Sequence, residues 1–203
     1  MKRNIKSVIF TAILAFAFAL TACKFFDNNQ PKTKKQNTNT PATNPSGEVP
    51  GDPELELDSC ELPLTLEAIT AGKIILSGKD SFERISIQKG DGLVYDIADI
   101  IDVQPGDKIR FYGCNYINDG TVNLTINCTA DCYVYGNAMS LLYYTNFTGK
   151  TQITQNYAFQ KLFLNNTHIK NHETLDIVLP ATSLSEGCYK KLFYGCTVLT
   201  RAP

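Results

Sequence analysis

The sequence lacks the residue patterns that most catalytic and cofactor-binding sites require. It has no tryptophan and only two histidines, and it contains no glycine-rich phosphate loop, no Gly-x-Ser-x-Gly nucleophile elbow and no His-Glu-x-x-His zinc motif. Its formal net charge is −1, so it has no excess of positive charge with which to bind nucleic acid. We therefore predict a protein that is not an enzyme and has no cofactor, no small-molecule substrate and no nucleic-acid partner.

The few side chains that could carry chemistry are scattered along the chain. His168 and His172 are four residues apart, which on a helix would place them on one face, but their position between repeat elements favours a solvated turn. Cys128 and Cys132 are the cysteines that could begin a zinc site, but they lie in the strand-forming region, far along the chain from the two histidines. Asp96, Asp99 and Asp102 fit polar turn or strand-edge positions. No catalytic residue and no metal ligand is predicted.

Residues 1–22 have the layout of a secretory signal peptide. A basic segment at residues 1–6 precedes an apolar run at residues 8–20, which is too short for a comfortable transmembrane helix. The run ends in Leu20-Thr21-Ala22-Cys23, which resembles the lipobox of bacterial lipoproteins. The resemblance implies that Cys23 becomes the acylated first residue of the mature chain and anchors it to a membrane. The alternative is that Cys23 closes an ordinary signal peptide.

Residues 23–58 are predicted to be a lipidated N-terminus and a disordered tether. They are rich in Asn, Thr, Pro, Lys and Gln, and such a segment cannot bury enough apolar surface to offset the entropy of ordering it. The alternative is that the segment packs as part of the folded region. The residue after Cys23 is Lys24, and an aspartate there would favour retention in the inner membrane. The predicted location is the cell envelope, at the outer membrane or the cell surface.

Residues 59–136 are predicted to form a β-rich domain. Apolar and polar residues alternate with a period of two at residues 85–87, 109–111 and 122–128, which indicates half-buried strands. Turn signals separate these segments, at Gly90-Asp91-Gly92, Pro105-Gly106-Asp107 and Asn118-Asp119-Gly120. Short strands joined by such turns indicate a small β-sandwich or barrel.

One hairpin in this region can be predicted in register. A three-residue loop at residues 129–131 would place Cys128 opposite Cys132 and Ile126 opposite Val134, with all four side chains on one face. One of the seven cysteines is assigned to lipid, so six remain in a chain that is exported to a compartment where disulfides form. A Cys128–Cys132 disulfide and a pair of buried thiols that fill the core are both compatible with this register.

After residue 136 the apolar residues recur at helical spacing, in residues 138–142, 158–163 and 188–196. The last two segments match at an offset of 30 residues, with Lys161-Leu162-Phe163 aligned to Lys191-Leu192-Phe193. Each unit is predicted to be a short helix followed by a short extended segment. Such an element buries its apolar face only against a neighbouring copy.

The second unit carries a specific family pattern. Leu179-Pro180-Ala181-Thr182-Ser183-Leu184, then Cys188-Tyr189, then residues 192–203 (LFYGCTVLTRAP) resemble one repeat of the BspA-like leucine-rich repeat surface proteins, whose tandem units have the form LPATTL, CY, MFYGCTSL and TAP. Residues 136–143 also resemble the segment that joins the β-rich leading domain of those proteins to their first repeat.

The first unit departs from the family pattern, because Asn165-Asn166 stands where a regular unit has Gly-Cys. It is therefore predicted to be a degenerate, capping-type repeat. The resemblance implies that Cys188 and Cys196 are small apolar fillers inside a stacked ladder, and a reactive or metal-binding pair is the alternative. The chain ends where the next unit would begin, so residues 137–203 are interpreted as an incomplete repeat segment, resting on the β domain, completed by another chain, or left as the stump of a longer protein.

The sequence thus predicts an α+β chain, in which a small β-sandwich-like domain precedes the start of a leucine-rich-repeat solenoid. The resemblance implies a bacterial surface lipoprotein that adheres to host matrix proteins or to bacterial surface proteins. Exposed Tyr143, Tyr144, Phe147 and Tyr194 would serve as contact anchors, and core packing is the alternative for each. The alternative function is a passive structural envelope lipoprotein, or a truncated remnant of a longer repeat protein, with no ligand of its own.

Overall fold

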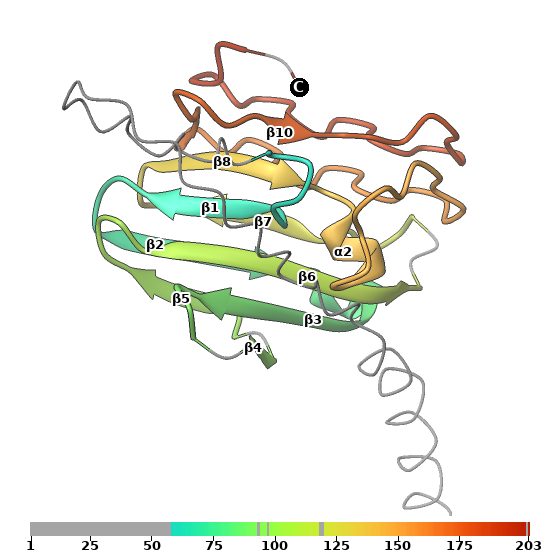
Figure 1. The fold of residues 1–203 in the computed structure, drawn as a ribbon, viewed down its shortest axis with the longest axis horizontal. Coiled ribbons are helices and arrows are strands. Elements are labelled where there is room, and N and C mark those ends of the chain that lie inside the picture. The colour runs from blue at the N-terminus through green and yellow to red at the C-terminus, as the bar shows by residue number, and fades with distance from the viewer. Residues whose placement is uncertain (1–57, 93, 97, 118–119, 202) are drawn as a thin grey trace, which may run out of the picture. The chain divides into compact units, whose positions relative to one another are not determined.

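The structure is a computed structural model that describes residues 58–203 except 93, 97, 118–119 and 202. These residues all lie in one compact unit, Leu55–Pro203. The predictions for the leader, for Cys23 and Lys24, and for the tether up to residue 57 fall outside the described residues. Within the described part the chain is mostly β-strand, turn and loop, with few helical residues (Figure 1).

The strands form two sheets. The larger sheet has seven strands, in the order β10-β8-β1-β6-β3-β4 with β9 also paired to β8, and the smaller sheet has three, in the order β5-β2-β7. All pairs are antiparallel except those of β8 with β9 and with β10, which are parallel. The elements are β1 Thr65–Ala68, β2 Gly72–Ser77, the 3-10 helix η1 Lys79–Ser81, β3 Phe82–Lys89, β4 Val94–Asp96, β5 Ile100–Val103, β6 Lys108–Tyr116, β7 Thr125–Cys128, β8 Cys132–Asn137, the α-helix α2 Ser140–Tyr143, β9 Ile169–Asn171 and β10 Ile177–Val178.

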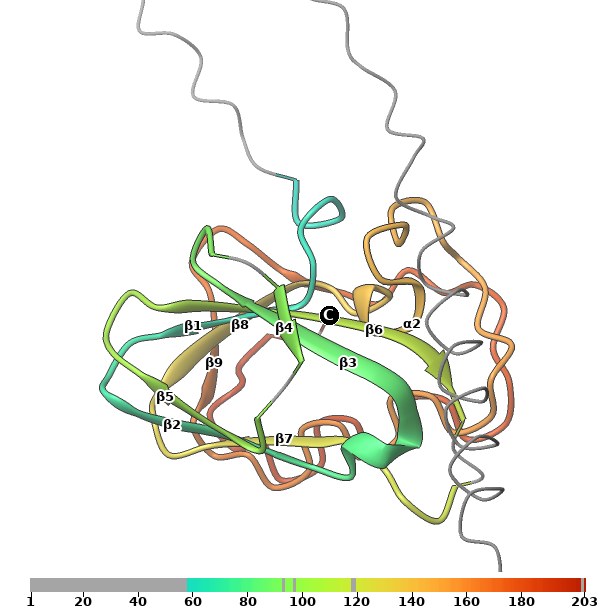
Figure 2. The same cartoon turned by 90° about the horizontal axis from the view of Figure 1, so that it is seen from below.

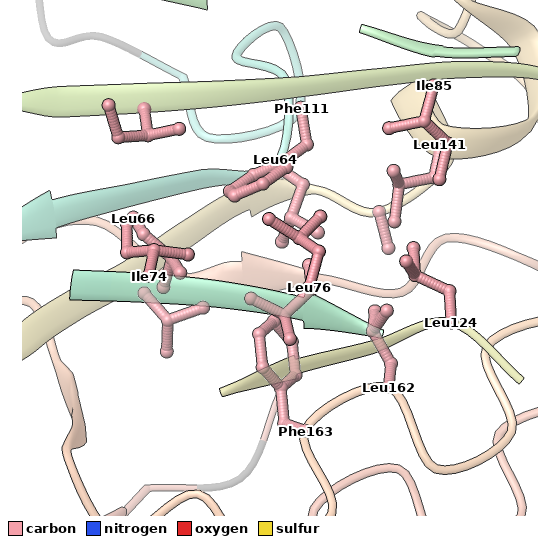
Figure 3. Close-up of a cluster of buried hydrophobic side chains, with 14 of the residues drawn as sticks. Leu64, Leu66, Ile74, Leu76, Ile85, Phe111, Leu124, Leu141, Leu162 and Phe163 are labelled. Carbon is pink, nitrogen blue, oxygen red and sulfur yellow. The ribbon is translucent and has the colours of Figure 1, made fainter. Parts of the chain in front are cut away.

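The two sheets enclose a common hydrophobic core (Figure 2). Side chains two residues apart on a strand share a face, and Ile74 and Leu76 of β2 are buried on the inner face of the smaller sheet. They point toward Leu66 and Phe111 of the larger sheet (Figure 3). Burying each such side chain contributes roughly 1.5–3 kcal/mol. The prediction of a β-rich domain built from short strands is therefore confirmed as an arrangement of two sheets.

The strands predicted at residues 85–87 and 109–111 lie inside β3 and β6 and are confirmed. The strand predicted over residues 122–128 begins only at Thr125. The turn predicted at residues 105–107 is present, with Gly106 at a φ of 87° and the Asp107 N–H donating to Gln104 O at 3.0 Å. A positive φ at this position is the reason that the turn needs glycine.

The predicted hairpin between Cys128 and Cys132 is wrong. Strand β7 pairs with β2, so that Ile126 lies opposite Leu76, and β8 pairs with β1, so that Val134 lies opposite Leu66. Residues 129–131 therefore carry the chain from the smaller sheet to the larger one. Both arrangements leave Ile126 and Val134 facing the core, which is why the apolar pattern alone could not distinguish them.

Residues 136–143 join the strands to the repeats through close backbone contacts. Asn137 Oδ1 accepts a hydrogen bond from the Met139 N–H at 2.9 Å at the start of α2. Ser140, fully buried, donates from Oγ to Phe111 O at 2.8 Å and accepts from the Leu64 N–H at 3.0 Å. The short helix is thus fixed to β6 and to the segment that leads into β1.

The helices predicted in the two repeats are absent, and residues 156–165 and 186–195 are consecutive turns instead. The N–H groups of Leu162 and Leu164 donate to carbonyls three residues back, at Phe159 and Lys161, whereas an α-helix bonds four residues back. The apolar residues of the predicted helix are nevertheless buried, because Leu162 and Phe163 pack in the core shared with the sheets. The helical spacing therefore located the buried residues of the inner repeat correctly, whereas in the outer repeat only Leu192 of the predicted set is buried. In both repeats it predicted the wrong backbone conformation.

Candidate functional site

Residues 151–180 form the inner repeat and residues 181–203 the outer repeat, and the two are joined side by side by main-chain hydrogen bonds. The Ile153 N–H donates to Ser183 O at 2.9 Å, and the Phe163 N–H donates to Leu192 O at 3.0 Å. The inner repeat is joined to the larger sheet through the parallel pairs of β9 and β10 with β8. Figure 1 shows the outer repeat, in red, at the end of this stack.

The backbone repeats with the period that the sequence predicts. Positive φ angles occur at four positions of the inner repeat and at the four positions 30 residues later: Tyr157, Phe159, Lys161 and Asn165, matched by Gly187, Tyr189, Lys191 and Gly195. Asparagine tolerates the left-handed region better than most residues. Asn165 can therefore occupy the position that Gly195 has in the outer repeat without changing the path of the chain.

Aromatic rings stack between the two repeats. Phe159 lies parallel to Tyr189, with ring centroids 5.4 Å apart and an interplanar angle of 8°, and Phe163 lies parallel to Phe193 at 5.7 Å and 3°. Offset stacked rings contribute about 0.5–1.5 kcal/mol beyond the area that they bury. These two stacks align the repeats side chain by side chain.

Asn166 has the structural role that Cys196 has in the outer repeat. Its Nδ2 donates to Ile126 O at 3.2 Å, and Cys196 Sγ donates to Phe163 O at 2.9 Å. Each side chain thus satisfies a carbonyl of the preceding layer. Burial raises the pKa of the Cys196 thiol to about 11, which disfavours a reactive thiolate.

Two large apolar side chains of the outer repeat face solvent. Leu184 is 54% exposed and Tyr194 is 63% exposed. The Lys191 Nζ lies 5.6 Å from the centroid of the Tyr194 ring, so the ring has a cation beside it. Aromatic residues such as tyrosine are enriched at protein–protein interfaces, whereas lysine is depleted there.

The other predicted contact aromatics are less accessible. Tyr143 is half-buried and donates from its hydroxyl to Gln152 O at 2.8 Å. Tyr144 is half-buried and packs on Tyr112 with ring centroids 5.6 Å apart. Phe147 is 5% exposed and belongs to the core, so its prediction as a contact residue is wrong. The phenylalanine is apolar on all sides, and folding buries it.

Cys128 and Cys132 are free thiols buried in the core between the sheets. The Cys132 Sγ donates to Ala130 O at 3.5 Å. A hydrogen bond with the Cys132 thiol lowers the pKa of Cys128, and Asn166 Nδ2 adds a second hydrogen bond to Cys128 at 3.4 Å. The same thiol–thiol hydrogen bond, together with burial, raises the pKa of Cys132. The two sulfurs are neighbours although their strands belong to different sheets. The disulfide stays a prediction.

The two histidines flank β9 and bind different groups. His168 Nδ1 lies 2.9 Å from Asp131 Oδ1, and Lys170 Nζ lies 2.7 Å from Asp131 Oδ2. The Lys170 hydrogen bond, followed by that of His168, lowers the pKa of Asp131. His172 Nδ1 accepts from the N–H groups of residues 174 and 175. The His172 ring therefore stabilises the turn that follows it.

The predicted surface carboxylates form ion pairs at strand edges. Asp99 lies 2.8 Å from Lys79, and Asp102 lies 2.9 Å from Lys73. Both pairs are largely exposed, and such pairs contribute little to stability. The side chain of Asp96 falls outside the described residues.

Tyr157 and Asp131 each contact residues that are distant in the sequence, and no sequence pattern predicted these contacts. The Tyr157 ring lies between Gly120 and Gly187, so close that a Cβ on either glycine would meet it within 3 Å, and its hydroxyl donates to Glu186 Oε1 at 2.9 Å. Glycines 37 residues before and 30 residues after a tyrosine give no local signal of this contact.

In the described ranges, no cluster of three or more His, Cys, Asp or Glu side chains is arranged to hold a metal ion. None of the helices in the same ranges is long and apolar enough to cross a bilayer. Comparison with protein-family models, with curated proteins and with solved structures found no match.

Proposed function

We propose that this chain is a membrane-anchored bacterial surface lipoprotein that binds other proteins without catalysis. In this proposal Cys23 carries the lipid, residues 24–58 are the tether, and the folded unit is held away from the membrane at the outer membrane or cell surface. The two stacked repeats are the start of a leucine-rich-repeat solenoid of the BspA-like type. The partners are host matrix proteins or bacterial surface proteins.

The stacking of the two repeats is the observation that carries the proposal. Repeats that pack only on their neighbours form extended surfaces, which proteins of this architecture use for binding. The outer repeat offers Leu184 and Tyr194 to solvent, and tyrosine is enriched among the residues that dominate binding energy. The lipobox resemblance of residues 20–23 supports the anchored location.

A cell-binding assay tests the function. Bacteria that produce the full chain are applied to immobilised host matrix proteins and to immobilised bacterial surface protein extracts, and the retained cells are counted. We expect retention above that of cells without the chain. Replacing both outer side chains, Leu184→Ser and Tyr194→Ser, is expected to weaken binding by roughly a thousandfold, because anchor residues each contribute about 2 kcal/mol or more and about 1.4 kcal/mol corresponds to a tenfold change.

Ile100→Ser is the matched control. Ile100 is 51% exposed on β5, at the edge of the smaller sheet, so its replacement removes an exposed apolar side chain without touching the repeats. Equal loss of binding in both variants would contradict a role for the outer repeat. Retention no higher than that of cells without the chain would favour a passive envelope lipoprotein.

A further inference from the structure

The chain crosses from the smaller sheet to the larger one through residues 129–131, and a buried cysteine lies at each end of this crossing. Cys128 is the last residue of β7 and lies opposite Ile74 of β2. Cys132 is the first residue of β8 and lies opposite Ala68 of β1. Their exposed fractions are 4% and 0%. The two thiols therefore belong to different sheets although only three residues separate them.

Main-chain hydrogen bonds hold the crossing against both sheets. The Thr129 N–H donates to Lys73 O of β2 at 2.9 Å, and the Ile69 N–H, directly after β1, donates to Asp131 O at 2.7 Å. The crossing thus has a short and fixed path, and the two cysteine side chains are hydrogen-bonded to each other at its inner side.

This placement meets the main requirement for a disulfide, which is that the two sulfurs are already neighbours. A disulfide needs Cα atoms within about 7 Å and a bond of about 2.05 Å between the sulfurs. Thiols that share a hydrogen bond need only a small side-chain movement to reach that bond. Because no strand of one sheet is paired with a strand of the other, a covalent bond here would connect the sheets directly.

The inner repeat covers the two cysteines. Asn166 Nδ2 donates to Cys128 Sγ at 3.4 Å, and Asn166 Oδ1 accepts from the His168 N–H at 3.1 Å. His168 O in turn accepts the Cys132 N–H at 2.9 Å. An oxidant therefore cannot reach either sulfur in the folded chain, and oxidation has to occur before the inner repeat packs on the strands.

We propose that Cys128 and Cys132 become joined by a disulfide as the chain folds in an oxidising compartment, and that the inner repeat then shields this bond. The bond ties the smaller sheet to the larger one directly beneath Asn166. The inference rests on the proposed location outside the cytoplasm, because disulfides persist in such compartments and are rare in the cytosol.

The oxidant is a second disulfide, carried by a thiol oxidoreductase or by a small disulfide such as oxidised glutathione. The thiolate of one cysteine attacks a sulfur of the oxidant, so that a mixed disulfide forms and one thiol leaves. The second cysteine then attacks the first, and the other thiol of the oxidant leaves. The two cysteines lose two electrons and two protons, and the oxidant gains both and becomes two thiols.

Peptide mapping of the full chain, extracted from producing bacteria in mild detergent, tests the bond. Free thiols are blocked with N-ethylmaleimide at lysis, and the unfolded chain is cut by trypsin and by an endoproteinase that cuts before aspartate. The three cysteines of this region then lie on separate fragments, 111–118, 119–130 and 131–150. We expect 119–130 and 131–150 to be found joined, and to separate when the sample is reduced before digestion.

Refolding in vitro separates the chemistry of the pair from the location of the chain. The full chain is reduced, unfolded in urea and refolded in detergent with oxidised glutathione, and the same fragments are analysed. We expect the bond to form during refolding. It should form at least about tenfold more slowly when glutathione is added to the folded, reduced chain, because a buried sulfur reacts only when the structure opens.

The shielding by the inner repeat is tested with Asn166→Ala, and Asn165→Gly is the matched control. Dithiothreitol is added to both oxidised variants at a temperature at which circular dichroism shows that they are folded. We expect reduction of the bond to be roughly tenfold faster or more in Asn166→Ala than in the wild type, and unchanged in Asn165→Gly.

The outcomes separate the inference from the proposed function. Maleimide on both 119–130 and 131–150, in the chain from bacteria and after refolding with glutathione, would overturn the inference, and so would a bond from 111–118 to either fragment. Equal reduction rates in the two variants would contradict the shielding. If the bond forms in refolding but the chain from bacteria carries maleimide at both sites, the pair stands and the proposed location fails.

Discussion

Asn166 shows how a single buried polar residue fixes the inner repeat to the strands. Its side chain donates to Ile126 O and to Cys128 Sγ and accepts from the His168 N–H, and it is fully buried. Asn166→Ala leaves a carbonyl and an N–H unsatisfied in the core, so we expect the free energy of unfolding to fall by about 2–3 kcal/mol.

Asn165→Gly is the control for this substitution, because Asn165 is exposed and has a φ of 57°. We expect its free energy of unfolding to stay within about 0.5 kcal/mol of the wild type. Urea unfolding of the two variants measures the contrast. Equal effects would show that the hydrogen bonds of Asn166 do not hold the repeat.

Gly136 is needed for close approach of two backbone segments. Its φ is 89°, and a Cβ there would lie 2.1 Å from Pro63 O. Gly149 has a similar φ of 74° but nothing within 4 Å of its Cβ position. Gly149→Ala should therefore cost only the backbone penalty of about 1 kcal/mol, whereas Gly136→Ala should cost about 3 kcal/mol or more because main chain must move. Thermal unfolding that gave the two variants the same midpoint would contradict this packing.

Asp131 is expected to make stability depend on pH. Lys170 and His168 hold the pKa of its carboxyl below the ordinary value. The stabilisation is therefore complete above that ordinary value, near 4, and is lost as the pH falls through the lower value in the folded state. Asp131→Asn should lower the free energy of unfolding at neutral pH, and the difference from the wild type should shrink in acid. Urea unfolding from pH about 7 to about 3 measures it.

The control for this pH dependence is Asp102→Asn, which breaks an exposed ion pair with Lys73 and should change stability little at any pH. A difference between Asp131→Asn and the wild type that stayed constant with pH would contradict the role of the Asp131 carboxylate.

At the scale of elements, we expect the aromatic rings of the inner repeat to contribute more to the free energy of unfolding than those of the outer repeat. Phe163 has a covered ring and Phe193 has one face half open. Phe163→Ala should lower the free energy of unfolding by about 3–5 kcal/mol, and Phe193→Ala by half of that or less. Urea unfolding measures both, and an equal loss would mean that the outer repeat is covered as completely as the inner one.

Several elements could be predicted from the sequence because their signals are local. The alternation at residues 85–87 and 109–111 and the Pro-Gly turn at residues 105–107 depend on neighbours in the chain. The pairing of β7 with β2 joins residues about 50 positions apart, and no local pattern distinguishes it from the hairpin that residues 129–131 would allow.

The sequence predicts the 30-residue period of the repeats but not their backbone conformation. An offset of 30 residues is visible in the letters of the sequence, and the stacked rings at Phe163 and Phe193 follow from it. The turns that replace the predicted helices depend on hydrogen bonds between repeats, such as that from Lys161 to Lys190. Tertiary contacts of this kind override a local helical spacing.

At the scale of the whole molecule, strands and repeats share one core. The cluster of buried side chains that contains Ile74 and Phe111 from the sheets also contains Leu162, Ile169 and Leu192 from the repeats. Unfolding of the sheets is therefore expected to remove the support on which the inner repeat rests.

The account depends most on the location of this folded unit outside the cell. Cys60 is an exposed thiol at the start of the described chain, just after the predicted tether. A membrane-impermeant maleimide applied to intact producing bacteria is expected to label the wild-type chain strongly and the Cys60→Ser variant much less. In a separate fractionation, the Cys23→Ser variant is expected to be lost from the membrane fraction. Labelling of Cys60 only after the cells are lysed would contradict surface display.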